Sequence, residues 1–369
     1  MVEDRVALAA QRVQAAVRAA SRGLVEREVL VEVITLAAVA EEHVLVIGEP
    51  GTAKSEAVRR VARALGGRYF EYLLGRFTEP SELFGPIDLV KLQQGKLETV
   101  TTGMLPEAEI AFLDEVFLGS SAILNTLLAI LNERQFRRGG EARQVPLKIC
   151  VGASNALPED HSLAAFADRF LARVFVKAVP DSELEQLLTW GGQPAPGGGG
   201  ATMADLVTLT QARRAIDPSG VQTALAGAVR TLRKAGVALT DRRIVRSQHL
   251  IAAATALAGR QRATQADLWP LVYAVPTAIE QETAREVLRE ALTESDSPLN
   301  NAALDASASA TARATRLEET ARAALAQPDA LRIEGVLRDI DASFAPAALP
   351  APLTELRQQL KARVEQGQR

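Results

Sequence analysis

The sequence predicts an α/β protein in which a parallel sheet is flanked by helices and followed by a helical lid and a helical tail. Short apolar runs rich in β-branched residues alternate with helical patterns through the first 190 residues. Such runs are typical of strands buried on both faces, and their alternation with helices indicates a parallel sheet. From residue 203 onward, Ala, Leu, Arg and Glu dominate, which favours helix.

The predicted strands are short and end at turn signals. The first, residues 43–47, stops at a Gly/Pro turn, and two helical patterns precede it. The other strands are expected at residues 69–73, 110–113, 147–151 and 174–176. Helices are expected between them at residues 54–65, 120–132 and 163–171.

The chain is expected to have four segments. Residues 1–190 form the α/β core, 191–202 a Gly-rich linker, 203–285 a helical lid, and 286–369 a helical extension with a flexible start. The extension begins in polar, Ala/Ser-rich sequence between residues 293 and 312, and its helices are expected at residues 313–326, 331–340 and 353–365. Because glycines fill positions 197–200, we expect the linker to loosen the lid relative to the core.

Composition excludes several classes of protein. Apolar residues make up 47% of the 369 residues and charged residues 24%, as in ordinary globular proteins. A net charge of −3 offers no global field for nucleic acid, so nucleic-acid binding is not expected. The single cysteine, Cys150, excludes a disulfide framework within the chain and fits a reducing compartment. No segment has the apolar length of a membrane span, and no apolar signal core opens the chain, so we expect a cytoplasmic protein.

A phosphate-binding loop is predicted directly after the first strand. Its sequence is Gly48-Glu49-Pro50-Gly51-Thr52-Ala53-Lys54-Ser55, and a predicted helix begins at its end. Backbone N–H groups of such a loop surround phosphate oxygens, and the helix N-terminus adds positive potential. Lys54 is expected to bind the β- and γ-phosphates of ATP, and Ser55 to ligate Mg²⁺. Ala53 departs from the usual pattern, which has Gly before the lysine. The alternative interpretation is a plain strand–turn–helix.

Polar side chains follow two further strands. Asp114 and Glu115 end the strand at residues 110–113, and Asn155 follows the strand at residues 147–151. Asp114 is expected to hold Mg²⁺ directly or through water, and Glu115 to orient and polarise the attacking water. Asn155 could hydrogen-bond the γ-phosphate or that water. Ligands of such sheets bind beyond the carboxyl ends of the strands. The alternatives are a carboxylate pair at a helix N-terminus and an asparagine turn.

The motifs together resemble the MoxR family of AAA+ ATPases, and most closely its RavA-type subgroup. The resemblance covers residues 29–280 and includes Ala before the P-loop lysine. The matching segments are residues 84–86, 105–109, 112–116, 123–128, 131–134, 153–158 and 240–243. RavA itself carries a further domain in its helical region, and the sequence here shows no strand pattern for one.

The resemblance implies several further roles. Residues 87–100, expected as a hairpin around Gly95, resemble the insert that faces the central pore, and residues 136–147 resemble the basic hairpin before the sensor 1 asparagine, Asn155. Arg169 resembles an arginine finger for a neighbouring subunit, with Arg173, one helical turn later, as the competing candidate. Arg242 resembles the sensor 2 arginine, which bridges lid and nucleotide, and Arg243 stays open as its alternative.

The resemblance also implies a biological role. Members form rings, usually hexamers, that bind ATP between subunits, remodel or mature client proteins, and act with a partner carrying a von Willebrand factor A (VWA) domain. Two alternatives stay open. One is a DNA-acting, helicase-like motor, which the net acidity disfavours. The other is an ATP-binding scaffold without hydrolysis, which the complete set of site residues disfavours.

Overall fold

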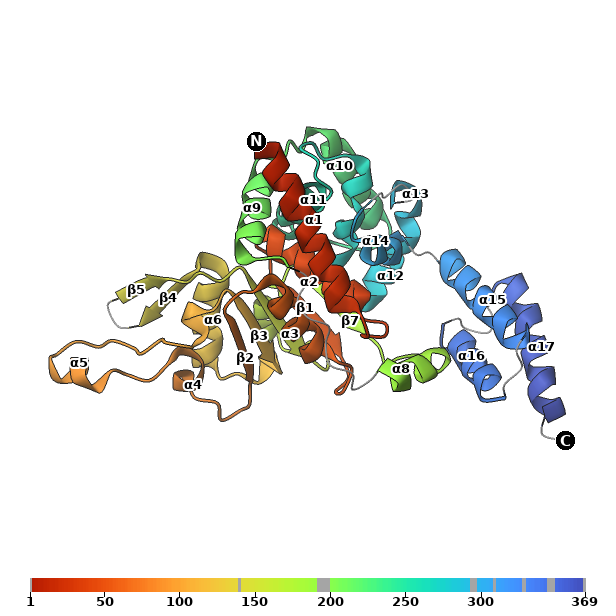
Figure 1. Cartoon of the computed structure of the whole chain (residues 1–369), viewed down its shortest axis with the longest axis horizontal. Helices are drawn as coiled ribbons and strands as arrows, with labels where there is room; N and C mark the ends of the chain where they lie inside the picture. The colour runs from red at the N-terminus through yellow and green to blue at the C-terminus, as the bar shows by residue number, and fades with distance from the viewer. Residues whose placement is uncertain are drawn as a thin grey trace.

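The central sheet has five parallel strands in the order β2-β3-β6-β1-β7 (Figure 1). We describe it in a computed structural model that covers residues 2–138, 141–190, 200–292, 297–307, 310–326, 330–343 and 349–367. The strands are β1 (Val44–Gly48), β2 (Tyr69–Leu73), β3 (Ile110–Asp114), β6 (Ile149–Ser154) and β7 (Ala172–Val176). All five predicted strands are therefore present, and the predicted parallel arrangement is confirmed.

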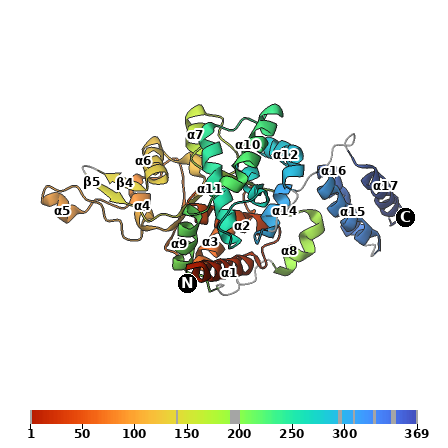
Figure 2. The ribbon, with the colours of Figure 1, turned by 90° about the horizontal axis from the view of Figure 1, so that it is seen from above.

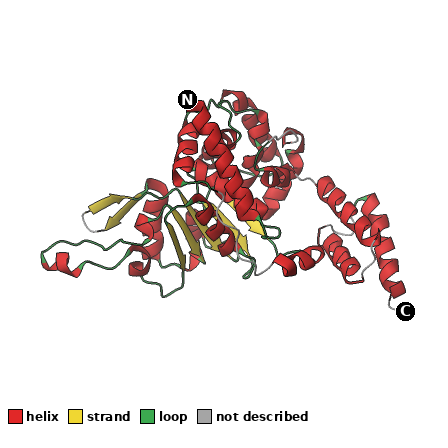
Figure 3. Ribbon diagram, in the orientation of Figure 1, coloured by secondary structure: helices red, strands yellow, loops and turns green. Residues whose placement is uncertain are grey.

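Helices lie between and around these strands. Those of the first half are α1 (Val2–Ser21), α2 (Glu28–Ala40), α3 (Lys54–Leu65), α4 (Pro80–Phe84), α5 (Leu89–Gln93), α6 (Ser121–Glu133), α7 (His161–Ala167) and α8 (Leu184–Trp190). The second half contains α9 (Met203–Arg214), α10 (Ser219–Lys234), α11 (Asp241–Leu257), α12 (Ala278–Val287), α13 (Arg289–Leu292), α14 (Asn300–Ser307), α15 (Ala310–Ala326), α16 (Ala330–Ser343) and α17 (Ala351–Gly367). The described strands all belong to the first half of the chain, and Figure 3 shows that the bundle near the C-terminus contains helices and no described strand.

The sheet separates two hydrophobic cores. Successive side chains of a strand point to opposite faces, so Val44 and Val46 of β1 enter the first core while Leu45 and Ile47 enter the second. Helices α4, α6 and α7 cover the second face. The first core includes α1, α2 and α3 and continues into α9, α10, α11, α12 and α14. The helical lid and one face of the sheet therefore share a single buried core.

Ion pairs also join the lid to the N-terminal edge of the sheet. Glu42, just before β1, accepts from Arg246 and from His249, the latter at 2.8 Å. Its side chain is only 3% exposed. Glu41 pairs with Arg213 at 3.2 Å and with Arg214 at 2.6 Å. These contacts bind α9 and α11 to the sheet. Residues 191–199, most of the predicted linker, lie outside the described residues.

The predicted pore insert differs in detail from expectation. The sequence predicts a hairpin at residues 87–100, but only Ile87 and Thr99 form a β-bridge, and the short helix α5 occupies its tip. The helix forms because the Asp88 side chain caps it, accepting from the N–H groups of Val90 and Lys91. The second predicted hairpin is confirmed as β4 (Gln135–Arg138) and β5 (Glu141–Gln144).

The extension divides between two bodies. Helix α14 lies inside the stretch expected to be loosely structured, yet Ala302, Ala303 and Ala306 are buried in the first core. Helices α15, α16 and α17 form a third cluster of their own. In both views this bundle lies at the opposite end of the molecule from α5 and the β4–β5 hairpin (Figures 1 and 2).

A buried carboxylate helps to hold α14 in place. Glu32 on α2 is 5% exposed and accepts from the side-chain amide of Asn301 and from the backbone N–H of Ala302, both at 2.7 Å. It thereby satisfies a donor at the start of α14 that the helix itself leaves free. Its partners are about 270 residues away along the chain, so no local sequence pattern predicts the contact. Of the helices that the structure describes, none combines the length and hydropathy needed to cross a bilayer.

We expect Glu32→Ala to lower the free energy of unfolding by about 3 kcal/mol, because it leaves buried donors of α14 without an acceptor. Thermal unfolding and limited proteolysis between α13 and α14 measure the effect. The matched control is Glu355→Ala, which removes an exposed carboxylate on α17 and should change neither. Equal stability of the two variants would show that α14 docks without this contact.

Candidate nucleotide-binding site

Three strand ends meet at the C-terminal edge of the sheet. β6 pairs with β1 on one side and with β3 on the other. Because all three strands are parallel, the P-loop after β1, the carboxylates at the end of β3 and the asparagine after β6 share this edge. The register places Ile47 beside Ser154, so Asn155 follows directly next to the start of the P-loop.

The P-loop turns from β1 into α3 through two left-handed residues. Gly51 has φ +80° and Ala53 has φ +58°. Ala53 is also the residue that caps α3, and its side chain makes no cap hydrogen bond. The first N–H groups of α3 thus have no intrahelical acceptor, which is the arrangement that binds phosphate at helix N-termini. Ala53 adopts, at a steric cost, the conformation for which glycine is suited.

Gly48 is fixed by a close approach of the neighbouring strand. A Cβ at this position would lie 2.4 Å from the carbonyl oxygen of Val176 on β7. A side chain would therefore push apart β1 and β7 where the loop begins. The glycine serves strand packing, while the freedom needed for the turn itself lies at Gly51.

Lys54 is folded back onto the loop. Its ammonium donates to the carbonyl oxygens of Gly48 and Glu49 at 2.6 and 2.9 Å, and the residue is 7% exposed. Burial lowers the pKa of Lys54, while the charges of Asp114 and Glu115 raise it. The two carboxylates thus lie close enough to influence the lysine. The arrangement holds a cation beside two anions at the sheet edge.

Glu115 and Asn155 are in direct contact. The side-chain amide of Asn155 donates to Oε1 of Glu115 at 2.7 Å. Glu115 has φ +49°, and its N–H donates to Oδ1 of Asp114 at 3.0 Å. The left-handed backbone turns the chain immediately after β3. The hydrogen bond between Asn155 and Glu115 joins the ends of β3 and β6.

The arginine candidates lie near the N-terminal ends of the strands, at the opposite edge of the sheet from the P-loop. Asp168 and Arg169 precede β7, whose first residue, Ala172, pairs with Val44 at the start of β1. The P-loop begins four residues further along β1, roughly 13 Å away at the rise of a strand. Arg169 is half-buried, and its Nε lacks a hydrogen-bond partner among the described residues.

The two lid arginines lie beside that segment. Arg243 is 2% exposed and donates to Asp168 at 2.9 Å and to the carbonyl oxygens of Phe170, Leu171 and Ala274. All of its donor nitrogens are therefore engaged within its own subunit. Arg242 is exposed and donates to the side chain of Asn132 at 2.8 Å. Of the two, Arg242 is the one whose side chain is exposed.

Arg173 lies on strand β7, not on a continuation of the helix that the spacing from Arg169 suggested. It is 6% exposed and donates to the carbonyl oxygen of Pro276 at 2.6 Å. Burial, reinforced by the charge of Arg243, lowers the pKa of Arg173 to about 10. Of these two arginines, Arg169 is therefore the more accessible.

Sequence reasoning missed one residue that contacts the P-loop. Arg27, immediately before α2, is 4% exposed and donates from Nε to the carbonyl oxygen of Thr52 at 2.8 Å. Its other end donates to the carbonyl oxygen of Lys177, just beyond β7, at 2.8 Å. Both acceptors are backbone atoms distant in sequence, so no motif or side-chain pattern could have identified the contact.

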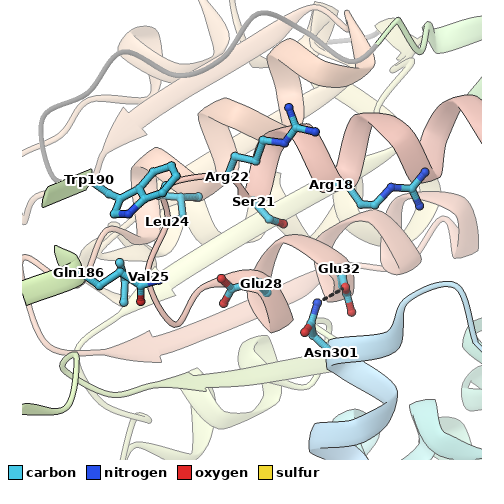
Figure 4. A pocket seen from close by; sticks show the side chains of 11 residues that line it. Arg18, Ser21, Arg22, Leu24, Val25, Glu28, Glu32, Gln186, Trp190 and Asn301 are labelled. Atoms are coloured by element: carbon cyan, nitrogen blue, oxygen red, sulfur yellow. Dashed lines mark hydrogen bonds between the residues drawn. The ribbon is translucent and has the colours of Figure 1, made fainter. Parts of the chain in front are cut away.

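A cavity of about 290 Å³ lies beside the segment that carries Arg27. Figure 4 shows Trp190 of α8 beside Leu24, with Arg22 and Val25 also in the lining. The lining also includes Glu32 and Asn301, which are hydrogen-bonded to each other. None of the predicted site residues lines this cavity. No group of three or more potential metal ligands of the His, Cys, Asp and Glu type occurs among the described residues.

Comparison with known proteins agrees with this geometry. Residues 11–199 match a family described as the MoxR domain in the MoxR-vWA-beta-propeller ternary systems. Two uncharacterized proteins of Methanocaldococcus jannaschii are each 36% identical to 66% of this chain. The chain spans 65% and 64% of their lengths. The chaperone MoxR1 of Mycobacterium tuberculosis is 26% identical over 52% of this chain and 51% of its own.

A solved structure supports the fold. The crystal structure of a candidate ATPase from Cytophaga hutchinsonii superposes with a TM-score of 0.63 over 80% of this chain and 97% of its own, at 14% identity. At this identity the likeness concerns the fold alone. The family match, in contrast, covers just over half of the chain and includes the P-loop, both carboxylates and Asn155. The chain belongs to the MoxR family of AAA+ ATPases.

Proposed function

We propose that the chain hydrolyses ATP at sites shared between the subunits of a ring. One observation carries the proposal: the P-loop and the arginines Arg169 and Arg242 lie at opposite edges of the same sheet. A single subunit therefore holds only half of the predicted site. Repeated contact between one edge and the opposite edge of the next copy is head-to-tail, and such contacts form a ring when the rotation between copies closes. A hexamer is the usual number in the family.

The proposed roles follow from the positions of the residues. The loop from Gly48 to Ser55 binds the phosphates through its N–H groups and Lys54. Ser55 and Asp114 offer oxygen ligands, the type that Mg²⁺ prefers. Bound Mg²⁺ supplies positive charge at the β- and γ-phosphates. Glu115 orients the attacking water, and its contact with Asn155 holds that carboxylate in place. Arg169 acts on nucleotide bound by the neighbouring subunit, and Arg242, the sensor 2 candidate, connects the lid to nucleotide.

The work that this hydrolysis drives is proposed from the family. The matched family is named for systems that combine a MoxR domain with a VWA protein and a β-propeller, and one relative is named a chaperone. We propose remodelling or maturation of client proteins together with a VWA-domain partner. Within the family, the segments at residues 112–134 favour the RavA-type subgroup. DNA-stimulated hydrolysis would revive a DNA-acting motor instead.

Assembly should control activity. Because each site needs two subunits, we expect the ATPase rate per subunit to rise with protein concentration as rings form. Light scattering on the same samples reports the rings. A rate that stays flat while the protein is monomeric would rule out shared sites and favour a solitary nucleotide switch.

We expect Glu115→Gln to retain ATP binding and to reduce turnover by roughly 100-fold or more, because loss of a group that activates water typically costs that much. Equilibrium binding and steady-state ATPase assays separate the two effects. Glu133→Gln is the matched control, since Glu133, the last residue of α6, forms an exposed pair with Arg137 on β4. Unchanged turnover in Glu115→Gln would remove Glu115 from this role.

We expect Arg169→Ala to reduce turnover by roughly 1,000-fold in the assembled ring, because an arginine finger stabilises charge in the transition state. Mixing this variant with Glu115→Gln should restore activity. Each variant supplies the half-site that the other lacks, and about one interface in four is then complete. A mixture that stays inactive, although the variants assemble together, would mean that Arg169 does not act between subunits. Arg173→Ala should mainly destabilise the fold.

A further inference from the structure

Arg27 is a buried cation that binds backbone oxygens of the P-loop and of neighbouring segments. Its guanidinium donates to the carbonyl oxygens of Thr52, Lys177 and Glu26, at 2.8, 2.8 and 2.5 Å. All three acceptors are backbone oxygens, and no ion pair between described residues includes Arg27. Buried charges are normally paired with an opposite charge. The side chain therefore occupies an unusual position, bridging the loop to the strand end beside it.

The bond to Thr52 fixes the orientation of one peptide group in the loop. The C=O and N–H of a trans peptide point in opposite directions, and no described peptide bond is cis. Because the Thr52 oxygen points to Arg27, the N–H of Ala53 points to the opposite side of the loop. That N–H belongs to the residue immediately before the phosphate-binding Lys54.

The Thr52–Ala53 peptide directly precedes Ala53, the strained residue of the loop. Ala53 has φ +58°, a conformation that glycine adopts freely and alanine does not. A rotated Thr52–Ala53 peptide would relieve the alanine and turn its N–H away. Something must therefore oppose that rotation, and the Arg27–Thr52 bond does so from a buried, rigid position. Arg27 is itself preceded by Glu26 at φ +58°, so the segment that delivers the guanidinium is also held in a specific conformation.

The guanidinium, bonded to Thr52, also acts on the site through its charge. The charge of Arg27 is among the influences that lower the pKa of Lys54, after burial. Burial likewise lowers the pKa of Arg27 itself, against the opposing charges of Glu26 and Glu28. Two partly desolvated cations near one loop favour an anionic ligand there.

We propose that Arg27 is a positioning residue for nucleotide binding, which holds the Thr52–Ala53 peptide in the orientation that presents the Ala53 N–H to phosphate. The inference rests on the nucleotide site proposed above. It explains how this chain uses alanine at a position where P-loops usually have glycine. Glycine adopts a positive φ without strain, whereas Ala53 is held at a positive φ by the hydrogen bond from Arg27 to Thr52.

The test is equilibrium binding of the fluorescent nucleotide mant-ADP with Mg²⁺ to the full chain. Arg27→Gln should weaken binding roughly tenfold or more, since a hydrogen bond from a charged group is lost. Arg27→Lys keeps the charge but cannot bridge two carbonyl groups as a guanidinium does, so an intermediate loss is expected. It also keeps the inference testable if the glutamine variant folds poorly.

A second substitution separates positioning from general stability. Ala53→Gly removes the backbone strain that favours rotation of the Thr52–Ala53 peptide. The double variant Arg27→Gln/Ala53→Gly should therefore recover much of the lost affinity. The control is Arg285→Gln, which removes another buried guanidinium, bound to Asp305 between α12 and α14. It should lower the unfolding temperature without weakening mant-ADP binding.

The outcomes distinguish the proposals. Wild-type affinity in Arg27→Gln would overturn the positioning role, and so would a loss that Ala53→Gly does not reduce. A loss of affinity in Arg285→Gln equal to that in Arg27→Gln would also overturn it, because the effect would then reflect stability alone. If the wild-type chain does not bind mant-ADP at all, the proposed nucleotide site fails, and this inference fails with it.

Discussion

The parallel register of β1 with β6 and β7 is the constraint on which the rest of the structure depends. It brings the P-loop, the carboxylates after β3 and Asn155 to one edge of the sheet, and it leaves the segment before β7 at the other. The close approach of β1 and β7, which excludes any side chain at Gly48, keeps this register tight where the loop begins. The division of the predicted site between two edges follows from strand direction alone.

The edge opposite the P-loop is where the lid is attached. Glu41, Glu42 and Asp168 receive arginines from α9 and α11, and Arg243 binds both Asp168 and the backbone around Arg169. A movement of α11 relative to the sheet would therefore shift the segment that carries Arg169. Since the lid and one sheet face share a core, lid and sheet face are mechanically continuous. This is how the fold can link the position of the lid to the position of Arg169.

The P-loop combines local strain with distant support. Its left-handed Ala53, its back-folded Lys54 and its tether to Arg27 are separate features of one conformation. Functional sites commonly hold residues in unfavourable conformations that the surrounding structure enforces. Here the enforcing group comes from the turn between α1 and α2. The same turn lies against Trp190 and the cavity of Figure 4.

The sequence by itself determined the parts of this protein that depend on local pattern. The sequence predicts the buried strands, the amphipathic helices and the spacing of Gly48, Lys54, Asp114 and Glu115. Each of these reflects the geometry of a single element or turn. The tertiary structure alone decided the contacts between distant segments. Glu32 accepts a hydrogen bond at the start of α14, and Arg27 donates one to the P-loop. Arg173 is buried inside the chain. Such contacts join side chains to backbone atoms far along the chain, and backbone atoms carry no residue-specific signal.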